Sequence, residues 1–259
     1  MPDFHPGVDN IRIRMVYKRS ATVSELAGLK RYIPNVSDCD SVTASDLVKW
    51  FVRGILAGIC ISMGGVVLLG TMASVGAQYK WVGACLFAIG LFTVIHFGFN
   101  LYTGKIGYVL ENDRVYLVQV ALGLIGNLVG CLIIGYAFQF DGAVTMCEAK
   151  IDGLDLSDPY SIFVNLMKGV MCGMLMFIAV DYHKTKGSFL ATFVAVPVFI
   201  MAGFEHSIAD MFYFSSAMMW DMDAVIFILI IIIGNAIGGM LIPAYRLYIN
   251  GERKTEKVQ

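Results

Sequence analysis

The sequence predicts an all-α membrane protein: six transmembrane helices in two inverted three-helix repeats, with the second and fifth spans broken. Hydrophobic residues make up 58% of the 259 positions and charged residues only 15%, whereas a soluble domain carries about 25% charged residues. The mean hydropathy is +0.71, and six apolar runs are long enough to cross a bilayer, which requires about 20 residues. Short motifs also recur in the same order in the two halves of the chain.

The apolar runs define the expected domain boundaries. They lie at roughly 46–72, 80–100, 115–138, 161–182, 187–204 and 223–247. Residues 1–45 are polar and basic and are expected to form a cytoplasmic arm, followed by a transmembrane domain over 46–247 and a cytoplasmic tail over 248–259. Within the transmembrane domain, the first repeat covers 46–138 and the second covers 161–247.

The distribution of basic residues predicts the orientation in the membrane. Lys and Arg are retained on the cytoplasmic side, and an even number of spans places both termini on the same side. The N-terminal arm and the tail are basic, whereas the segment 139–160 is acidic and is expected to lie outside. We therefore expect a multi-pass protein of the cell (inner) membrane with both termini in the cytoplasm.

Three pairs of motifs predict the internal repeat. They are 53–58 with 168–173, 98–100 with 203–205, and 126–130 with 234–238. Each half contains three spans, an odd number, so the second half must enter the membrane from the opposite face. Inverted repeats of this kind place a site near the middle of the membrane, between the halves. The third pair has a GNxxG pattern, which we interpret as packing, since small residues let helices approach closely.

The second pair of motifs marks two interrupted segments, 98–107 and 197–210. Irregular backbone at membrane depth is tolerated only around a cavity or inside protein, so we expect the two breaks to face one another, with Thr103 opposite His206. Ser207 and Asp210 have capping-box spacing, which predicts a helix whose N-terminus points toward His206. The positive end of such a helix favours an anion at His206.

The segments GFEHSIADMF (203–212) and NLYTG (100–104), the paired GNxxG motifs and the position of Lys168 resemble the formate/nitrite transporter family of pentameric anion channels. The resemblance covers nearly all of residues 46–247. It implies an aquaporin-like fold with a pore in each protomer of a homopentamer in the lipid bilayer. In that pore His206 is the central histidine, and a loop of the second span faces it. The implied loop residues are Asn100, Leu101 and Thr103, and the implied constriction residues are Phe87, Leu91, Phe199 and Phe204.

Three departures from the family pattern bear on the substrate. Asn100 stands where formate and nitrite members usually have an acidic residue. Gly104-Lys105 replaces a Ser-rich or Gly-Asn continuation of the loop, and Asp210 replaces an asparagine. The chain is most similar to the hydrosulfide branch, which implies export of the small monovalent anion HS⁻. A formate or nitrite channel or transporter is the alternative, and passive conduction and proton coupling both remain open.

The polar residues at the breaks have expected roles. An imidazole near neutral pH donates a hydrogen bond or a proton to a weak-acid anion, which is the role expected of His206. Thr103 either donates its hydroxyl to the anion or caps the half-helix. Glu205 is expected to brace its loop by accepting backbone N–H groups, and Asp210 to be structural.

Two lysines have alternative interpretations. Lys168 is either an interfacial lysine with its ammonium group in water or part of a positive field that attracts anions. Lys105 is expected in the first turn of a half-helix, where a cation opposes the helix dipole. It either extends to cytoplasmic water or adds to the same field.

Other function classes lack their sequence signatures. A haem-anchoring subunit needs facing histidines, but only four histidines occur and His5 and His183 lie outside the expected core. A neutral-solute channel of the aquaporin type needs Asn-Pro-Ala boxes, which the sequence lacks. No nucleophile-base constellation, nucleotide loop or metal-binding cysteine spacing occurs, so we expect no enzyme, cofactor or metal. The net charge of −1 argues against nucleic-acid binding.

Overall fold

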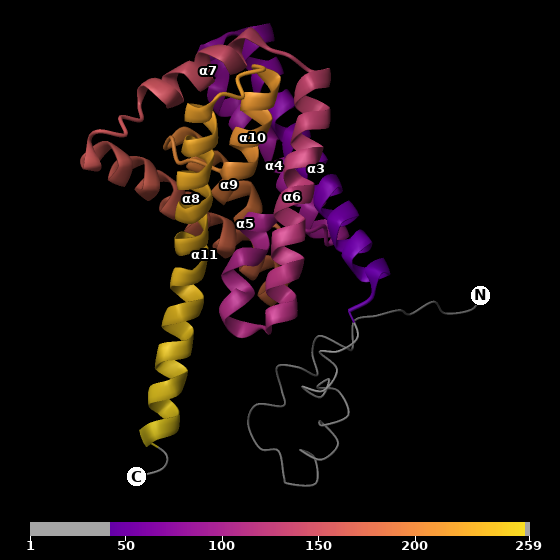
Figure 1. Ribbon diagram of the computed structural model, residues 1–259, viewed down its shortest axis with the longest axis vertical. Helices are drawn as coiled ribbons and strands as arrows, with labels where there is room; N and C mark the ends of the chain where they lie inside the picture. The colour runs from indigo at the N-terminus through magenta and orange to yellow at the C-terminus, as the bar shows by residue number, and fades with distance from the viewer. Residues whose placement is uncertain (1–41, 257–259) are drawn as a thin grey trace, which may run out of the picture. The chain divides into compact units, whose positions relative to one another are not determined.

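The computed structural model describes residues 42–256, and the side chains of residues 42–249. The expected N-terminal arm, 1–45, therefore lies almost entirely outside the described residues. Every regular element of the described part is helical. In chain order the elements are α3 (Ala44–Val75), η2 (Ala77–Tyr79), α4 (Lys80–Phe97), α5 (Tyr102–Lys105), η3 (Ile106–Glu111), α6 (Arg114–Ala137), α7 (Asp141–Asp152), α8 (Pro159–Lys186), α9 (Leu190–Met201), α10 (Ser207–Ser216) and α11 (Met222–Glu256) (Figure 1).

Among the described residues, five helical segments are long and apolar enough to cross a membrane. They are Ala44–Val75, Ala77–Phe97, Arg114–Ala137, Pro159–Lys186 and Met222–Ile249. The expected fifth span, 187–204, contains only the 12-residue α9. At 1.5 Å per residue α9 is roughly 18 Å long, which is shorter than a hydrocarbon core of about 30 Å.

Two segments outside the expected spans contain helix. The segment 139–160 contains α7, which lies at the upper end of the bundle in Figure 1. The tail expected from residue 248 continues as part of α11 to Glu256, and the lower end of α11 is at the opposite end of the molecule from α7.

A glycine with positive φ lies at the start of each interruption, just after the preceding helix ends. The helix α4 ends at Phe97, Gly98 has a φ of 66°, and α5 begins only at Tyr102. The helix α9 ends at Met201, Gly203 has a φ of 71°, and α10 begins at Ser207. Glycine adopts positive φ without a steric penalty, so it allows the chain to leave the helix at these points. The interruptions expected from the sequence are therefore present.

Close helix packing surrounds both interruptions. The helix α3 packs against α6, and α8 packs against α11. A Cβ atom added at Gly58 would lie 2.2 Å from the carbonyl oxygen of Asn127, and one at Gly173 would lie 2.2 Å from that of Asn235. The glycines of the repeated motifs thus allow backbone-to-backbone contact, as expected for small-residue packing.

The first GNxxG asparagine also holds the first interrupted segment. The amide nitrogen of Asn127 donates to the carbonyl oxygens of Gly54, at 2.8 Å, and Asn100, at 2.9 Å. Its amide oxygen accepts from the backbone N–H of Tyr102 at 2.9 Å. One buried side chain therefore satisfies two backbone groups that the broken helix leaves without helical partners, the Asn100 carbonyl and the Tyr102 N–H, and ties them to α3 through Gly54.

Asn235 makes the equivalent hydrogen bonds in the second half. Its amide nitrogen donates to the carbonyl oxygens of Gly169, at 2.8 Å, and Glu205, at 2.9 Å. Its amide oxygen accepts from the backbone N–H of Ser207 at 2.9 Å. The packing expected of the GNxxG motifs is therefore present at their glycines, and their asparagines add a role that was not expected, pairing the loop backbone.

Replacing either asparagine by alanine is expected to destabilise the protein. Asn127→Ala leaves two buried carbonyl oxygens and one buried N–H group without this partner. The Gly54 carbonyl keeps its partner within α3, so two groups are left unsatisfied. Each costs about 1–3 kcal/mol, so the free energy of unfolding should fall by about 2 kcal/mol or more. The measurement is thermal or denaturant unfolding of the purified protein in detergent, with Asn235→Ala as the equivalent variant.

Gln139→Ala is the control for this prediction, because its amide makes one long, exposed bond to the Tyr136 carbonyl oxygen, at 3.4 Å. Equal stability of Asn127→Ala and Gln139→Ala would show that the loop does not depend on the asparagine.

Candidate functional site

The two interruptions meet at a hydrogen bond between Thr103 and His206. The Oγ1 atom of Thr103 lies 2.8 Å from Nε2 of His206, and both residues are buried, at 1% and 2% exposure. Thr103 is the second residue of α5, and His206 is the N-cap of α10. Thr103 therefore does not cap its own half-helix, which was one of the expected alternatives; its hydroxyl bonds across to the other half of the chain.

The hydrogen bonds of His206 assign its tautomer. Its Nδ1 atom accepts from the backbone N–H of Ala209 at 3.1 Å, so Nδ1 carries no proton in this arrangement. The proton of the neutral ring is then on Nε2, which donates to Thr103. The positive end of α10 also disfavours a second proton on the ring. His206 is therefore arranged as a neutral hydrogen-bond donor.

The expected Ser207–Asp210 capping box is absent. His206 caps α10 through its Nδ1 atom, and Ser207 is the first helical residue. The Oγ atom of Ser207 is buried without a hydrogen-bond partner among the described residues. Asp210 turns away from the helix end and contacts Lys150 of α7 at 3.1 Å. An imidazole can cap because a ring nitrogen accepts the same N–H group that a serine oxygen would accept.

Apolar side chains surround the His206–Thr103 pair. The ring of Phe199 stacks on His206, with centroids 5.7 Å apart and an interplanar angle of 21°. Phe87 meets Phe199 edge-on at 6.2 Å. Leu91 and Leu101 are each 1% exposed, whereas Phe204 is only partly buried. The structure thus places Phe199 against His206 and Phe87 against Phe199, and it buries Leu91 and Leu101 in the same hydrophobic core, with Phe204 only partly buried against that core.

A cavity of about 360 Å³ lies between the His206 loop and α7, and we call it the upper cavity. His206, Glu205, Phe199 and Phe204 line it, together with three lysines. These are Lys80, Lys150 and Lys168. Lys168 also donates to the side-chain oxygen of Asn165 at 3.3 Å, and its carbonyl oxygen accepts from the N–H of Glu205 at 3.3 Å.

Lys150 forms a buried cluster with Glu205 and Asp210 beside the upper cavity. Its Nζ atom donates to a carboxylate oxygen of Glu205 and lies 3.1 Å from Oδ1 of Asp210. Its side chain is only 10% exposed. Burial alone would lower the pKa of Lys150, but the negative charges of Asp210 and Glu205 raise it by more than burial lowers it. The net pKa therefore lies above the usual range, and the ammonium group keeps its charge.

The cluster corrects the expectation for Glu205 and adds Lys150, which the sequence analysis does not single out. Glu205 does not brace its loop by accepting backbone N–H groups; its carboxylate pairs with Lys150, and Asn235 pairs the loop backbone. The one signal for Lys150 in the sequence is that it is the single lysine in the acidic segment 139–160.

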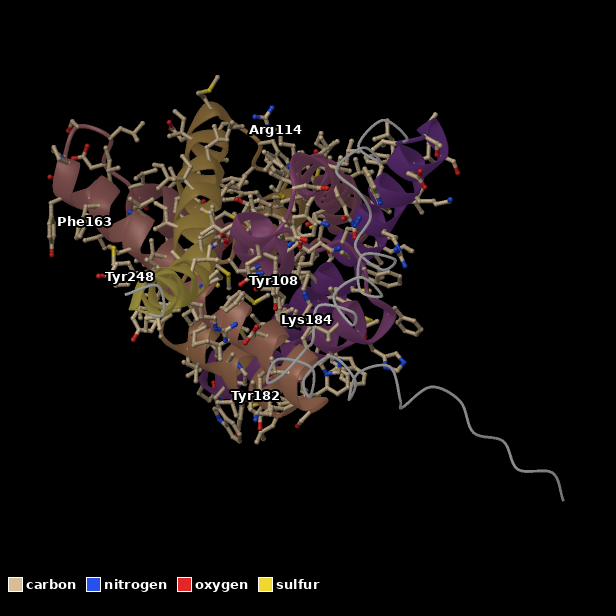
Figure 2. The ribbon with its side chains drawn as sticks, turned by 90° about the horizontal axis from the view of Figure 1, so that it is seen from below. Tyr108, Arg114, Phe163, Tyr182, Lys184 and Tyr248 are labelled. Carbon is tan, nitrogen blue, oxygen red and sulfur yellow. The ribbon has the colours of Figure 1, made fainter. Side chains whose placement is uncertain are left out.

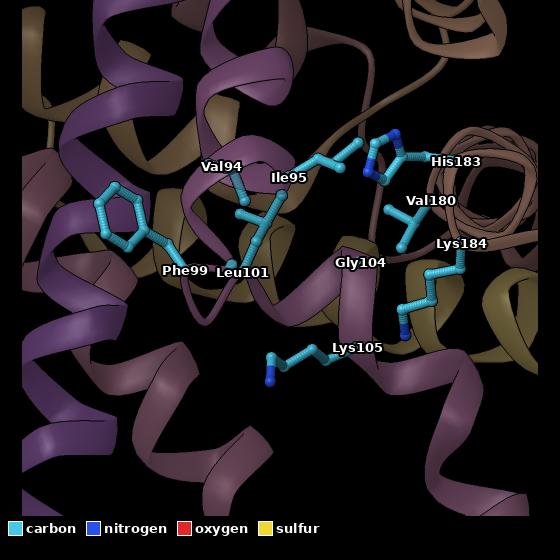
Figure 3. A pocket seen from close by; sticks show the side chains of 10 residues that line it. Val94, Ile95, Phe99, Leu101, Gly104, Lys105, Val180, His183 and Lys184 are labelled. Carbon is cyan, nitrogen blue, oxygen red and sulfur yellow. The ribbon is translucent and has the colours of Figure 1, made fainter. Parts of the chain in front are cut away.

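A second cavity, of about 170 Å³, lies next to α5, and we call it the lower cavity (Figure 3). Its lining is apolar at Val94, Leu101 and Val180. The basic side chains of Lys105, Lys184 and His183 also line it. Lys184 lies over the ring of Tyr108, with Nζ 3.4 Å from the centroid, near the middle of the lower face (Figure 2).

Two other expected site residues have partners on neighbouring helices. Lys105 is the last residue of the single-turn helix α5, as expected for a cation in the first turn, and its Nζ atom lies 5.8 Å from the ring centroid of Tyr116. Asn100 donates to the carbonyl oxygen of Trp50 at 3.0 Å and accepts from Gln119 at 3.3 Å. Asn100 therefore braces its loop against α3 and α6, and it lines neither described cavity.

Comparison with known proteins identifies related sequences. A profile described as Formate/nitrite transporter matches residues 35–249. The chain is 27% identical over 245 residues to the Formate channel FocA of Haemophilus influenzae, covering 77% of this chain and 86% of that protein. It is 24% identical over 238 residues to the Probable formate transporter of Methanothermobacter thermautotrophicus, covering 76% and 87%. These relatives are channels and transporters rather than enzymes.

Two solved structures share the fold. An FNT family ion channel superposes with a TM-score of 0.65 at 19% identity, covering 88% of this chain and 94% of its own. A structure described as a pentameric formate channel with formate bound superposes with a TM-score of 0.63 at 18% identity, covering 80% and 98%. At these identities the likeness shows the fold alone.

Removing the Lys150 charge is expected to destabilise the protein. Lys150→Met leaves Glu205 and Asp210 buried without their cation. Breaking a buried ion pair on one side costs about 3–5 kcal/mol, which should appear as a lower unfolding temperature in detergent. Adding Glu205→Gln and Asp210→Asn to Lys150→Met should restore part of the loss, because no buried charge then remains in the cluster.

Lys49→Met is the matched control, since Lys49 pairs with Asp46 on the surface with its side chain 66% exposed. Exposed pairs contribute about 0–1 kcal/mol. A loss for Lys150→Met no larger than for Lys49→Met would show that the cluster does not stabilise the fold.

Proposed function

The chain belongs to the formate/nitrite transporter family, and we propose that it is a transmembrane channel for small monovalent anions with His206 at its centre. The observation that carries this proposal is the hydrogen bond between His206 and Thr103, which joins the two interrupted segments between the upper and lower cavities. A polar pair enclosed by apolar rings is an arrangement suited to a selective barrier.

We propose that the architecture is the six-span inverted repeat expected from the sequence, aquaporin-like, with a transmembrane domain over 46–247. The equivalent hydrogen bonds of Asn127 and Asn235 support a duplicated scaffold. In this arrangement α9 and α10 form the broken fifth span, and α4 and α5 the broken second. Both termini are cytoplasmic in a cell (inner) membrane, and the protein forms a pentamer, as in the pentameric formate channel that shares its fold.

The proposed mechanism begins with exchange of hydrogen bonds. An anion reaching the constriction replaces Thr103 as the acceptor of the Nε2–H group of His206, and the Thr103 hydroxyl is then free to donate to the anion. These donors replace part of the hydration shell that the anion loses between Phe87, Leu91, Leu101 and Phe199. Because Nδ1 is occupied by the Ala209 N–H, hydrogen-bond donation is favoured over proton donation.

Lysines at the two cavities supply the attraction for anions. Lys168 lines the upper cavity and Lys105 lines the lower one. A cleft with positive charge and low-dielectric walls raises the local concentration of anions. Lys150 adds to the lining of the upper cavity, although its charge is offset by the carboxylates beside it.

Hydrosulfide and formate or nitrite are the alternative substrates of this channel. We propose hydrosulfide on the basis of the sequence departures at Asn100, Lys105 and Asp210. Formate or nitrite is the alternative, and it is favoured by the relatives named as formate channels and transporters. Both substrates use the same path and the same hydrogen-bond donors.

Anion flux into proteoliposomes tests the proposal. Hydrosulfide, formate, nitrite and chloride are compared across pH for wild type, His206→Asn and His206→Phe. His206→Phe removes the central donor, and a hydrogen bond to a charged group contributes about 1.5–3 kcal/mol, so flux should fall about tenfold to a hundredfold. His206→Asn keeps an N–H donor and should retain more of the flux.

His96→Asn is the control, because His96 is exposed on α4 and lines neither described cavity. Unchanged flux and unchanged pH dependence in His206→Phe would refute the central role of the histidine. Preference for formate or nitrite would replace hydrosulfide as the substrate and leave the site in place. Absence of anion flux in folded wild-type protein would refute the channel function.

A further inference from the structure

We propose that the carboxyl groups of Glu205 and Asp210 hold one proton between them, and that this proton regulates the charge that an anion meets in the upper cavity. The proton site rests on the buried cluster itself. Its effect on transport rests on the proposed channel function.

The cluster contains two carboxyl groups but only one cation. Two carboxyl groups contact a single ammonium group, that of Lys150, so full ionisation leaves one net negative charge. The side chains of Lys150, Glu205 and Asp210 are only 10%, 12% and 1% exposed. An uncompensated charge in such surroundings is unfavourable, and one bound proton makes the cluster neutral.

The two carboxyl oxygens of Asp210 differ in their surroundings. Oδ1 lies 3.1 Å from Nζ of Lys150, whereas Oδ2 is buried and receives no hydrogen bond from the described residues. A buried ionised oxygen requires a donor. A proton on Asp210 converts this oxygen into a donor itself, and the neighbouring carboxyl group is that of Glu205, which contacts the same Nζ atom of Lys150. Two carboxyl groups in one site characteristically share a proton in this way.

The other titratable groups around Asp210 do not compete for this proton. Those facing the cluster or lining the upper cavity are Lys150 and Cys147 from α7, Lys168 and Cys172 from α8, Lys80 from α4, Tyr213 on α10, and His206. Lys150 keeps its charge, and burial raises the pKa of the Cys147 thiol to about 12, so it stays neutral. His206 already accepts the N–H of Ala209 on its free ring nitrogen.

The remaining elements that pack against α10 add no charge to the cavity. These elements are α3, α5, α6 and α11, and none of their described residues contributes a charged side chain to the lining. The cavity charge is therefore set by three lysines and the carboxyl pair. Loss of the shared proton lowers this charge by one and weakens the attraction for anions, so flux through this path should fall as pH rises.

Infrared spectroscopy tests the proton site without requiring transport. Purified protein in lipid nanodiscs should show the C=O band of a protonated carboxyl group, and the band should be missing in Asp210→Asn and in Glu205→Gln. Asp152→Asn is the control, since Asp152 is exposed at the end of α7. A wild-type spectrum that differs from Asp210→Asn only in ionised carboxylate bands would overturn the proposal.

Flux measured at the same series of pH values tests the consequence. The ratio of Asp210→Asn flux to wild-type flux, taken at each pH, cancels the protonation of the anion itself. This ratio should rise over the pH range in which the wild-type infrared band disappears, and Glu205→Gln should behave similarly. A constant ratio would refute control of flux by the proton. A clear band in a protein that shows no flux in any variant would support the proton site and refute the channel function.

Discussion

The structure depends on pairing the backbone groups that the two broken helices expose. Water is scarce at membrane depth, so an unpaired N–H or carbonyl group there is strongly unfavourable. Asn127 and Asn235 each satisfy two such groups, a loop carbonyl and the N–H at the start of the next helix, and each also donates to a carbonyl of a neighbouring unbroken helix. This pairing fixes the loops that carry Thr103 and His206, and so it makes their hydrogen bond possible.

The two halves share this scaffold but differ in the side chains placed on it. At corresponding loop positions the first half has Asn100 and the second has Glu205. Asn100 bonds neutrally to Trp50, whereas Glu205 requires a buried cation and pairs with Lys150. The two buried carboxyl groups, Glu205 and Asp210, are therefore both on the side of α7. Hydrogen bonding of the backbone tolerates different side chains at these positions, so one scaffold supports a polar, charged cavity and a more apolar one.

Much of the fold was predictable because it depends on local composition. Long apolar runs predict spanning helices, and five of the expected spans are full-length helical segments. Glycine marked both interruptions, since Gly98 and Gly203 adopt positive φ where the helices end. The position of His206 opposite Thr103 followed from two such breaks in a repeated sequence. The helix over 141–152 was missed because its sequence is polar and lacks the apolar periodicity of the spans.

The sequence by itself determined the membrane class, five of the spans, the breaks and the family, because each is carried by residues close together in the chain. Only the tertiary structure decided the partners. Lys150 meets Glu205 across 55 positions, and Asn127 meets Gly54 across 73. The hydrogen bond between His206 and Thr103 likewise joins residues 103 positions apart. Such pairs form where helix packing closes long loops, and neither hydropathy nor spacing specifies which distant side chains a closed loop brings into contact.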